Sequence, residues 1–152
     1  GRNNKGQLGY DSTATIGDDE TPDAEGVVNL GSGRTAKKIT AGLEHTCAIM
    51  SDDNVKCWGE GANGRLGTGN TNDIGDNEAV SAGNDVDLGG AAAIHISTGQ
   101  IHSCVILTGG SVRCWGEGDN GRLGTGGTAD IGDNEAVSAG SAVNLGGGTA
   151  VE

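Results

Sequence analysis

Apolar residues alternate with polar ones in short runs along this chain of 152 residues, and turn-forming residues separate the runs. Alternation over about four to eight residues is typical of half-buried β-strands. In the second half of the chain it predicts four strands, at residues 86–88, 94–98, 102–107 and 112–116. A Thr108-Gly109-Gly110-Ser111 turn joins the last two, because glycine readily adopts the positive φ of a hairpin turn. Four short strands in about 57 residues are typical of one β-propeller blade.

The same pattern returns later in the chain at a constant spacing. Cys47 and Cys104 are separated by this spacing, and so are Trp58 and Trp115. Three sequence blocks recur with unchanged spacing: EHTCAIM at 44–50 as IHSCVIL at 101–107, VKCWGEGANGRLGTG at 55–69 as VRCWGEGDNGRLGTG at 112–126, and DIGDNEAVSAG at 73–83 and again at 130–140. A partial third copy lies at the start of the chain, where GQLG at 6–9 matches GRLG at 64–67. Its spacing to the second copy is one residue longer than the spacing between the second and third copies. A regular offset over three copies indicates a repeat architecture.

The repeats divide the chain into three parts of one propeller domain. Residues 1–38 form the back part of a first repeat and a linker, residues 39–95 form the second repeat, and residues 96–152 form the third. Gly1 stands where Gly59 stands in the second repeat, and the chain stops where another strand is due. We therefore expect an all-β fold of about three four-stranded blades. Further blades of a parent chain, or identical copies, would complete the ring.

The composition favours the same architecture. The chain has 31 Gly, one Pro, no Phe and only 2% aromatic residues, so a core of large side chains and long helices are both excluded. The apolar residues are mostly Ala, Val, Ile and Leu, which suit thin layers of short strands.

The formal net charge of −12 bears on which kinds of partner the chain can bind. An acidic surface repels phosphate backbones, which disfavours nucleic-acid binding. No stretch approaches the roughly 20 apolar residues of a membrane helix, so we expect no membrane insertion. The remaining partners are other proteins and cations.

Two linked motifs carry a resemblance to a known family. The pattern H-[TS]-C-x-[IL], followed by V-[KR]-C-W-G-x-G-x-N-G-R-L-G-x-G, resembles the regulator of chromosome condensation repeat family and covers essentially the whole chain. The resemblance implies a closed propeller, usually of six or seven blades. Two cysteines per repeat and the IGDDE or IGDNE loop look like the form found in exported bacterial proteins. Members of the family perform unrelated tasks, so the resemblance leaves the task open.

The four cysteines lie on the arms of two predicted hairpins. If each turn holds one bulge, Cys47 faces Cys57 and Cys104 faces Cys114 across neighbouring strands, close enough for two disulfides. The alternatives are buried free thiols or a metal site, although zinc requires closer spacing of its ligands. Disulfides would place the protein in an oxidising compartment, at the cell surface or outside the cell.

His45 and His102 precede these cysteines at the same offset, and Trp58 and Trp115 follow them. A cysteine–histidine catalytic pair is one interpretation. However, a catalytic pair is needed once and these residues recur, so we expect structural histidines. We likewise expect the tryptophans to pack between blades, with ligand stacking as the alternative.

A polar loop at about 70–85 carries the most notable surface chemistry. Its acidic residues recur in each repeat: Asp73, Asp76 and Glu78; Asp130, Asp133 and Glu135; and Asp18, Asp19 and Glu20. Oxygen ligands around a glycine suit Ca²⁺, but each cluster is too small to complete a calcium shell alone. The alternative is a solvated turn whose carboxylates cap backbone N–H groups. Arg65 and Arg122 are candidates to pair with these carboxylates.

No unrepeated set of acid, base and nucleophile appears, which argues against an enzyme. The unchanged loops favour a structural or protein-binding module of an exported bacterial surface or extracellular protein, such as a scaffold, adhesin or filament component. A partner-specific inhibitor or regulator that binds through its loops is the alternative.

Overall fold

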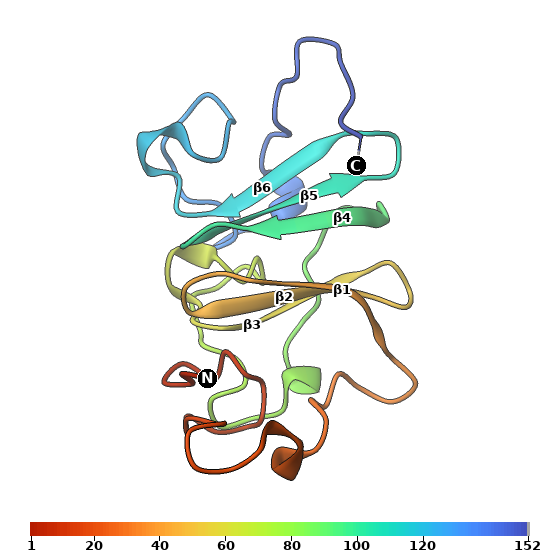
Figure 1. The fold of residues 1–152 in the computed structure, drawn as a ribbon. Coiled ribbons are helices and arrows are strands. Elements are labelled where there is room, and N and C mark those ends of the chain that lie inside the picture. The colour runs from red at the N-terminus through yellow and green to blue at the C-terminus, as the bar shows by residue number, and fades with distance from the viewer. Residues whose placement is uncertain (152) are drawn as a thin grey trace.

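The structure, a computed structural model, describes residues 1–151. Within these residues the fold is all-β, as the alternating pattern predicts: strands form two antiparallel three-stranded sheets, in the orders β1-β2-β3 and β4-β5-β6 (Figure 1). The strands are β1 (Ala36–Ala41), β2 (His45–Met50), β3 (Val55–Gly59), β4 (Ala93–Thr98), β5 (His102–Leu107) and β6 (Val112–Gly116). Short 3₁₀ turns are η1 (Pro22–Glu25), η2 (Ala62–Gly64), η3 (Val80–Ala82), η4 (Asp119–Gly121) and η5 (Val137–Ala139).

The two sheets have the same internal register, as the constant offset between the repeats requires. Cys47 lies opposite Cys57, and Cys104 lies opposite Cys114. Both predicted disulfides are present, and each joins residues ten apart in the sequence. The alternatives of free thiols and a zinc site are therefore wrong for these four cysteines.

The strand predicted at residues 86–88, in one blade with the strands at 94–116, is not a regular strand and does not join that sheet. Residues 86–88 meet the edge of the first sheet through one hydrogen bond, from the Val86 N–H to the Val55 carbonyl (2.8 Å). Val143 donates to Val112 in the same way (2.9 Å). Val86 and Leu88 are nevertheless buried, so the alternation predicted the burial of these side chains correctly. A single backbone bond is too little to form a ladder.

The sheets stack on one another, with β4 against β1 and β2 (Figure 1). Every residue of β2 is buried, whereas alternate residues of β5 are only half-buried. The difference follows from position, because β2 is covered by the second sheet and β5 has no sheet on its far side in the described chain. The apolar core is thin and continuous across both sheets.

The tryptophans pack between repeats, as we expect from the sequence. The Trp115 indole N–H donates to the Arg65 carbonyl of the preceding repeat, and that of Trp58 donates to the Gln7 carbonyl, both at 3.0 Å. Gly67 makes the close approach to Trp115 possible. It has a φ of +69°, and a Cβ there would lie 2.8 Å from the indole nitrogen.

His45 also joins neighbouring repeats. It is buried, and its Nε2 lies 3.0 Å from the Ser103 hydroxyl oxygen. Burial, with the positive charge of Arg65, lowers the pKa of His45 to about 4. The ring is therefore neutral at pH 7, in line with the structural role expected of this histidine.

Candidate functional site

The polar loop after β3 returns to the strand that it leaves. The Gly59 N–H donates to the Ile74 carbonyl (2.7 Å) and the Ile74 N–H donates to the Gly59 carbonyl (3.0 Å). Gly116 and Ile131 exchange the same two bonds after β6 (2.9 and 3.1 Å). The isoleucine side chains are buried, which anchors the polar loops on the apolar core.

Carboxylates inside the loops cap backbone N–H groups, as one of the two interpretations of the acidic residues predicts. A glutamate accepts a hydrogen bond from the glycine three residues before it in every copy: Glu20 from Gly17 (2.6 Å), Glu78 from Gly75 (3.1 Å) and Glu135 from Gly132 (3.0 Å). An aspartate accepts one across the loop: Asp73 from Gly61 (2.9 Å) and Asp130 from Gly118 (2.8 Å). These bonds give the repeated loops one shared conformation.

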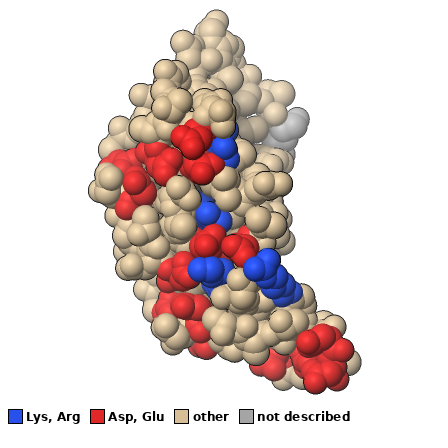
Figure 2. Space-filling view, turned by 90° about the vertical axis from the view of Figure 1, so that its left-hand side faces the viewer, with Lys and Arg blue, Asp and Glu red and all other residues tan. Residues whose placement is uncertain are grey.

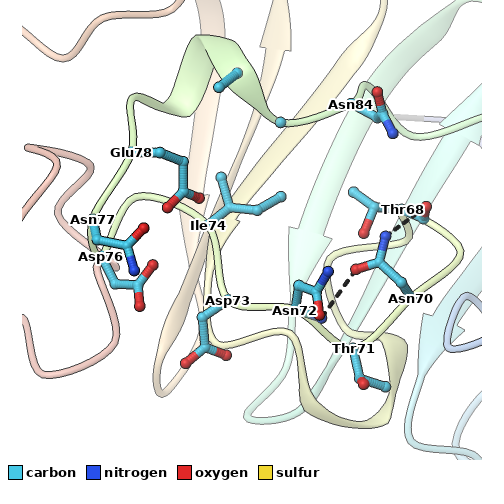
Figure 3. Close-up of a pocket in the computed structure, with 12 residues that line it drawn as sticks. Thr68, Asn70, Thr71, Asn72, Asp73, Ile74, Asp76, Asn77, Glu78 and Asn84 are labelled. Atoms are coloured by element: carbon cyan, nitrogen blue, oxygen red, sulfur yellow. Dashed lines mark hydrogen bonds between the residues drawn. The ribbon is translucent and has the colours of Figure 1, made fainter.

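An open pocket of about 760 Å³ lies on the loop of the second repeat (Figure 3). Its lining is mainly hydroxyl, amide and carboxylate groups: Thr68, Asn70, Thr71, Asn72, Asp73, Ile74, Asp76, Asn77, Glu78, Ala82, Gly83 and Asn84. The Asn70 amide donates to the Thr68 carbonyl (3.3 Å) and its oxygen accepts from the Asn72 N–H (3.0 Å). Such a lining suits a polar or charged segment better than an apolar ligand.

The carboxylates proposed as calcium ligands are not gathered equally in the three copies. Among residues 1–151, the one group of three or more carboxylates whose oxygens all lie within 4.8 Å of one another is that of Asp18, Asp19 and Glu20. Asp73, Asp76 and Glu78 do not form such a group, and in Figure 3 Asp73 lies apart from the other two. Their counterparts Asp130, Asp133 and Glu135 do not form one either within the described residues. Calcium binding at these loops stays a prediction.

Basic residues are interspersed among the acidic ones on this face. Figure 2 shows Asp and Glu side chains gathered over successive repeats, with Lys and Arg between them. Arg65 pairs with Glu60, and Arg122 pairs with Glu117, so these arginines bind the turn after the strand rather than the acidic loop.

Lys5 links the first copy to the loop of the second. It lies 3.4 Å from both Asp73 and Glu60. The carboxylate of Asp73, together with that of Glu60, raises the pKa of the Lys5 ammonium. The chain as a whole remains acidic, since it has 21 Asp and Glu against nine Lys and Arg.

A partly buried ionic cluster behind the loop does not follow from the sequence pattern. Lys56 is buried on β3, and its Nζ lies 3.1 Å from Asp85. Arg34 forms a two-pronged contact with the same carboxylate, at 3.0 and 2.8 Å. Burial alone would raise the pKa of Asp85, but hydrogen bonds from Arg34 and Lys56 outweigh it and hold that pKa below its usual value. The cluster fixes the linker and the end of the loop to the sheet.

Residues 36–65 and 93–122 match the regulator of chromosome condensation (RCC1) repeat. Both segments begin at or near the first strand of a sheet and end at the Gly-Arg that follows the last strand. The comparison thus supports the RCC1 repeat family.

Two curated proteins are similar to this chain over part of their length. The chain is 34% identical to the ultraviolet-B receptor UVR8 of Arabidopsis thaliana over 131 residues, which are 86% of this chain and 27% of UVR8. It is 36% identical to the serine/threonine-protein kinase Nek8 of Danio rerio over 93 residues, which are 61% of this chain and 13% of Nek8. The chain thus spans about a quarter or less of these relatives.

Solved structures support a partial propeller. Yeast RCC1 (Prp20) bound to Kap60 superposes with a TM-score of 0.64 and 19% identity, over 90% of this chain and 32% of that one. A second structure, Saccharomyces cerevisiae Prp20p, gives 0.62 over 90% of this chain and 33% of its own. In the described residues, no helix is long and apolar enough to cross a membrane.

Proposed function

We propose that this chain is a non-catalytic, protein-binding module of an exported bacterial surface or extracellular protein, of the scaffold, adhesin or filament class. The observation that carries the proposal is the recurrence of one polar loop conformation in successive repeats. Residues 73–83 and 130–140 are identical, and their capping bonds coincide. A repeated surface suits multiple contacts with a partner, whereas a catalytic site is needed once.

Two further findings support the proposal. Disulfides persist in oxidising compartments, and the chain has one in each complete sheet. In one of the matched structures, yeast RCC1 is bound to another protein, Kap60. A regulator that acts on a single partner is a weaker fit, because we expect its loops to have diverged between repeats.

Site-specific photo-cross-linking in cells of the source organism tests the binding surface. A photoreactive residue at Asn77, which is exposed on the rim of the polar pocket, should yield a covalent adduct with another protein. Asn54, an exposed asparagine on the turn between β2 and β3, is the matched control and should yield none. Equal labelling at the two positions, or none at either, would argue against a loop-based binding module.

A further inference from the structure

The loops of the second and third repeats differ in residues that line the polar pocket. Residues 68–84 and 125–141 are identical at every position but three. The second repeat has asparagine at all three positions, Asn70, Asn72 and Asn84, and all three line the pocket. The third repeat has small side chains there: Gly127, Ala129 and Ser141. Three amide groups at one pocket therefore distinguish two otherwise identical loops.

Two of these amides are available to a ligand. Asn70 shapes the loop, because its amide donates to the Thr68 carbonyl (3.3 Å) and its oxygen accepts from the Asn72 N–H (3.0 Å). Asn72 and Asn84 are exposed, and among the described residues neither side-chain amide has a hydrogen-bond partner. Each of these two side chains can offer two N–H donors and one carbonyl acceptor to a bound molecule.

Carboxylates lie across the pocket from these amides. In Figure 3, Asn72 lies on one side of the pocket, and Asp76 and Glu78 lie on the other. One oxygen of Glu78 accepts from the Gly75 N–H (3.1 Å). The Asp76 carboxylate is half-buried and has no hydrogen-bond partner among the described residues. The pocket thus presents N–H donors from one side and charged oxygen acceptors from the other.

A hydroxyl group fits this combination of donors and acceptors. It can accept a hydrogen bond from an asparagine amide and donate one to a carboxylate. A lysine side chain would bind mainly to the carboxylates, which are the same in both repeats, so it does not account for the added asparagines. An anion would be repelled by the carboxylates. A peptide backbone binds as an added strand at a sheet edge, whereas residues 68–84 contain one 3₁₀ turn, η3, and no strand.

We therefore propose that the pocket of the second repeat binds a neutral saccharide, whose neighbouring hydroxyls accept from Asn72 and Asn84 and donate to Asp76. The volume of about 760 Å³ lies within the roughly 300–1,000 Å³ of small-molecule sites. None of the described lining residues is aromatic, so a single sugar binds weakly, in the millimolar range. The saccharide site does not rest on the proposed function, because its asparagines belong to one repeat, whereas the proposed protein contacts recur. Loss of the saccharide site would leave cross-linking of a protein to Asn77 unaffected.

NMR titration of the ¹⁵N-labelled chain tests the saccharide site. The probes are the methyl glycosides of glucose, galactose, mannose and N-acetylglucosamine. At least one of them should shift the side-chain NH₂ signals of Asn72 and Asn84 in a saturable way. The absence of a saturable shift with all of these glycosides would overturn the proposal. Nα-acetyl-lysine methylamide is the comparison probe, and saturable binding of this cation alone would show that the pocket takes a basic protein segment instead.

Exchange of residues between the repeats supplies matched variants. Asn72→Ala combined with Asn84→Ser gives the second loop the residues of the third, and it should weaken glycoside binding about tenfold or more because hydrogen bonds to both amides are lost. Asn54→Ala is the control, because Asn54 is exposed on the turn between β2 and β3, and it should leave binding unchanged. Unchanged binding in the exchange variant would overturn the site.

The reverse exchange should create a second site. It gives the third loop the asparagines of the second: Gly127→Asn, Ala129→Asn and Ser141→Asn. Gly127 does not have a positive φ and has open space around it, so the loop tolerates asparagine there. We expect about two glycosides bound per chain, with new saturable shifts from the third repeat. Binding that stays at one glycoside per chain would show that the three asparagines do not define the site.

Discussion

At the scale of single residues, His45 couples stability to pH. Its pKa falls from an ordinary value near 6.5 to about 4 on folding, because burial disfavours the charged ring. Between pH 4 and 6.5 the folded state therefore binds fewer protons at His45 than the unfolded state does. Through this residue, the free energy of unfolding is highest above pH 6.5 and decreases as the pH falls toward 4. Burial lowers the pKa of His102 as well, which acts in the same direction.

We predict that the free energy of unfolding decreases by about 3 kcal/mol between pH 6.5 and 4 through His45 alone. Denaturant titrations at several pH values measure the free energy of unfolding. In the His45→Gln variant, the decrease between pH 6.5 and 4 should be smaller by about 3 kcal/mol. His95→Gln on β4 is the control, because it removes a histidine and leaves His45 in place, so the loss assigned to His45 should remain. A His45→Gln profile as steep as that of the wild type would show that His45 is not the coupled group.

The Lys56 and Asp85 pair gives a second prediction at this scale. Asp85→Asn leaves the Lys56 ammonium buried without its carboxylate, so we expect a loss of about 1–3 kcal/mol in the free energy of unfolding. Asp87→Asn is the control, because Asp87 is exposed and caps only Gly89. Equal effects of the two substitutions in chemical denaturation would contradict a special role for the ion pair of Asp85 with the buried Lys56.

At the scale of the element, the hairpins are the best predicted part of the fold. β5 and β6 have the bounds that the sequence predicts, and β4 begins one residue earlier. Alternation and a glycine turn are local properties, so they suffice to place a hairpin. Residues 86–88 differ because alternation reports which side chains are buried, and it does not report how many backbone bonds a segment makes.

Burial that depends on distant contacts was not predictable. Lys56 sits in an alternating strand, where a lysine normally reaches solvent. Its burial depends on Asp85 and on the carbonyl of Gly83, which follow only from the path of the loop. Capping of backbone N–H groups by the loop carboxylates was one of two interpretations of the sequence, but the partners in each bond and the pocket required the structure.

The disulfides are the element-scale prediction for stability. Replacing Cys47 and Cys57 with serine should lower the free energy of unfolding by about 2–3 kcal/mol, the value for a closed loop of ten residues. The same should hold for Cys104 and Cys114. Denaturant titration with and without reductant is the measurement. A variant without any of the four cysteines is the control and should not respond to reductant, whereas an insensitive wild type would contradict the prediction.

At the scale of the whole molecule, net charge opposes compactness. A chain with a net charge of −12 in 15.0 kDa repels itself, and salt screens this repulsion over about 10 Å at 0.1 M. We predict that the thermal midpoint rises by a few degrees, about 3 °C, between 0.02 and 0.3 M NaCl. Glycerol at matched osmolality is the control. A midpoint that falls with NaCl would mean that ion pairs such as Arg34 with Asp85 outweigh the general repulsion.

The short spacing within each cysteine pair has a consequence for oxidation of the newly made chain. Near-identical repeats offer wrong partners, such as Cys47 with Cys114, which lie much farther apart in the sequence than Cys47 and Cys57. Closing that longer loop costs about 1.7 kcal/mol more in chain entropy than closing the short one. Correct thiols therefore meet roughly an order of magnitude more often, before any sheet has formed. Each repeat can select its own crosslink without help from its neighbours, however many repeats lie in a row.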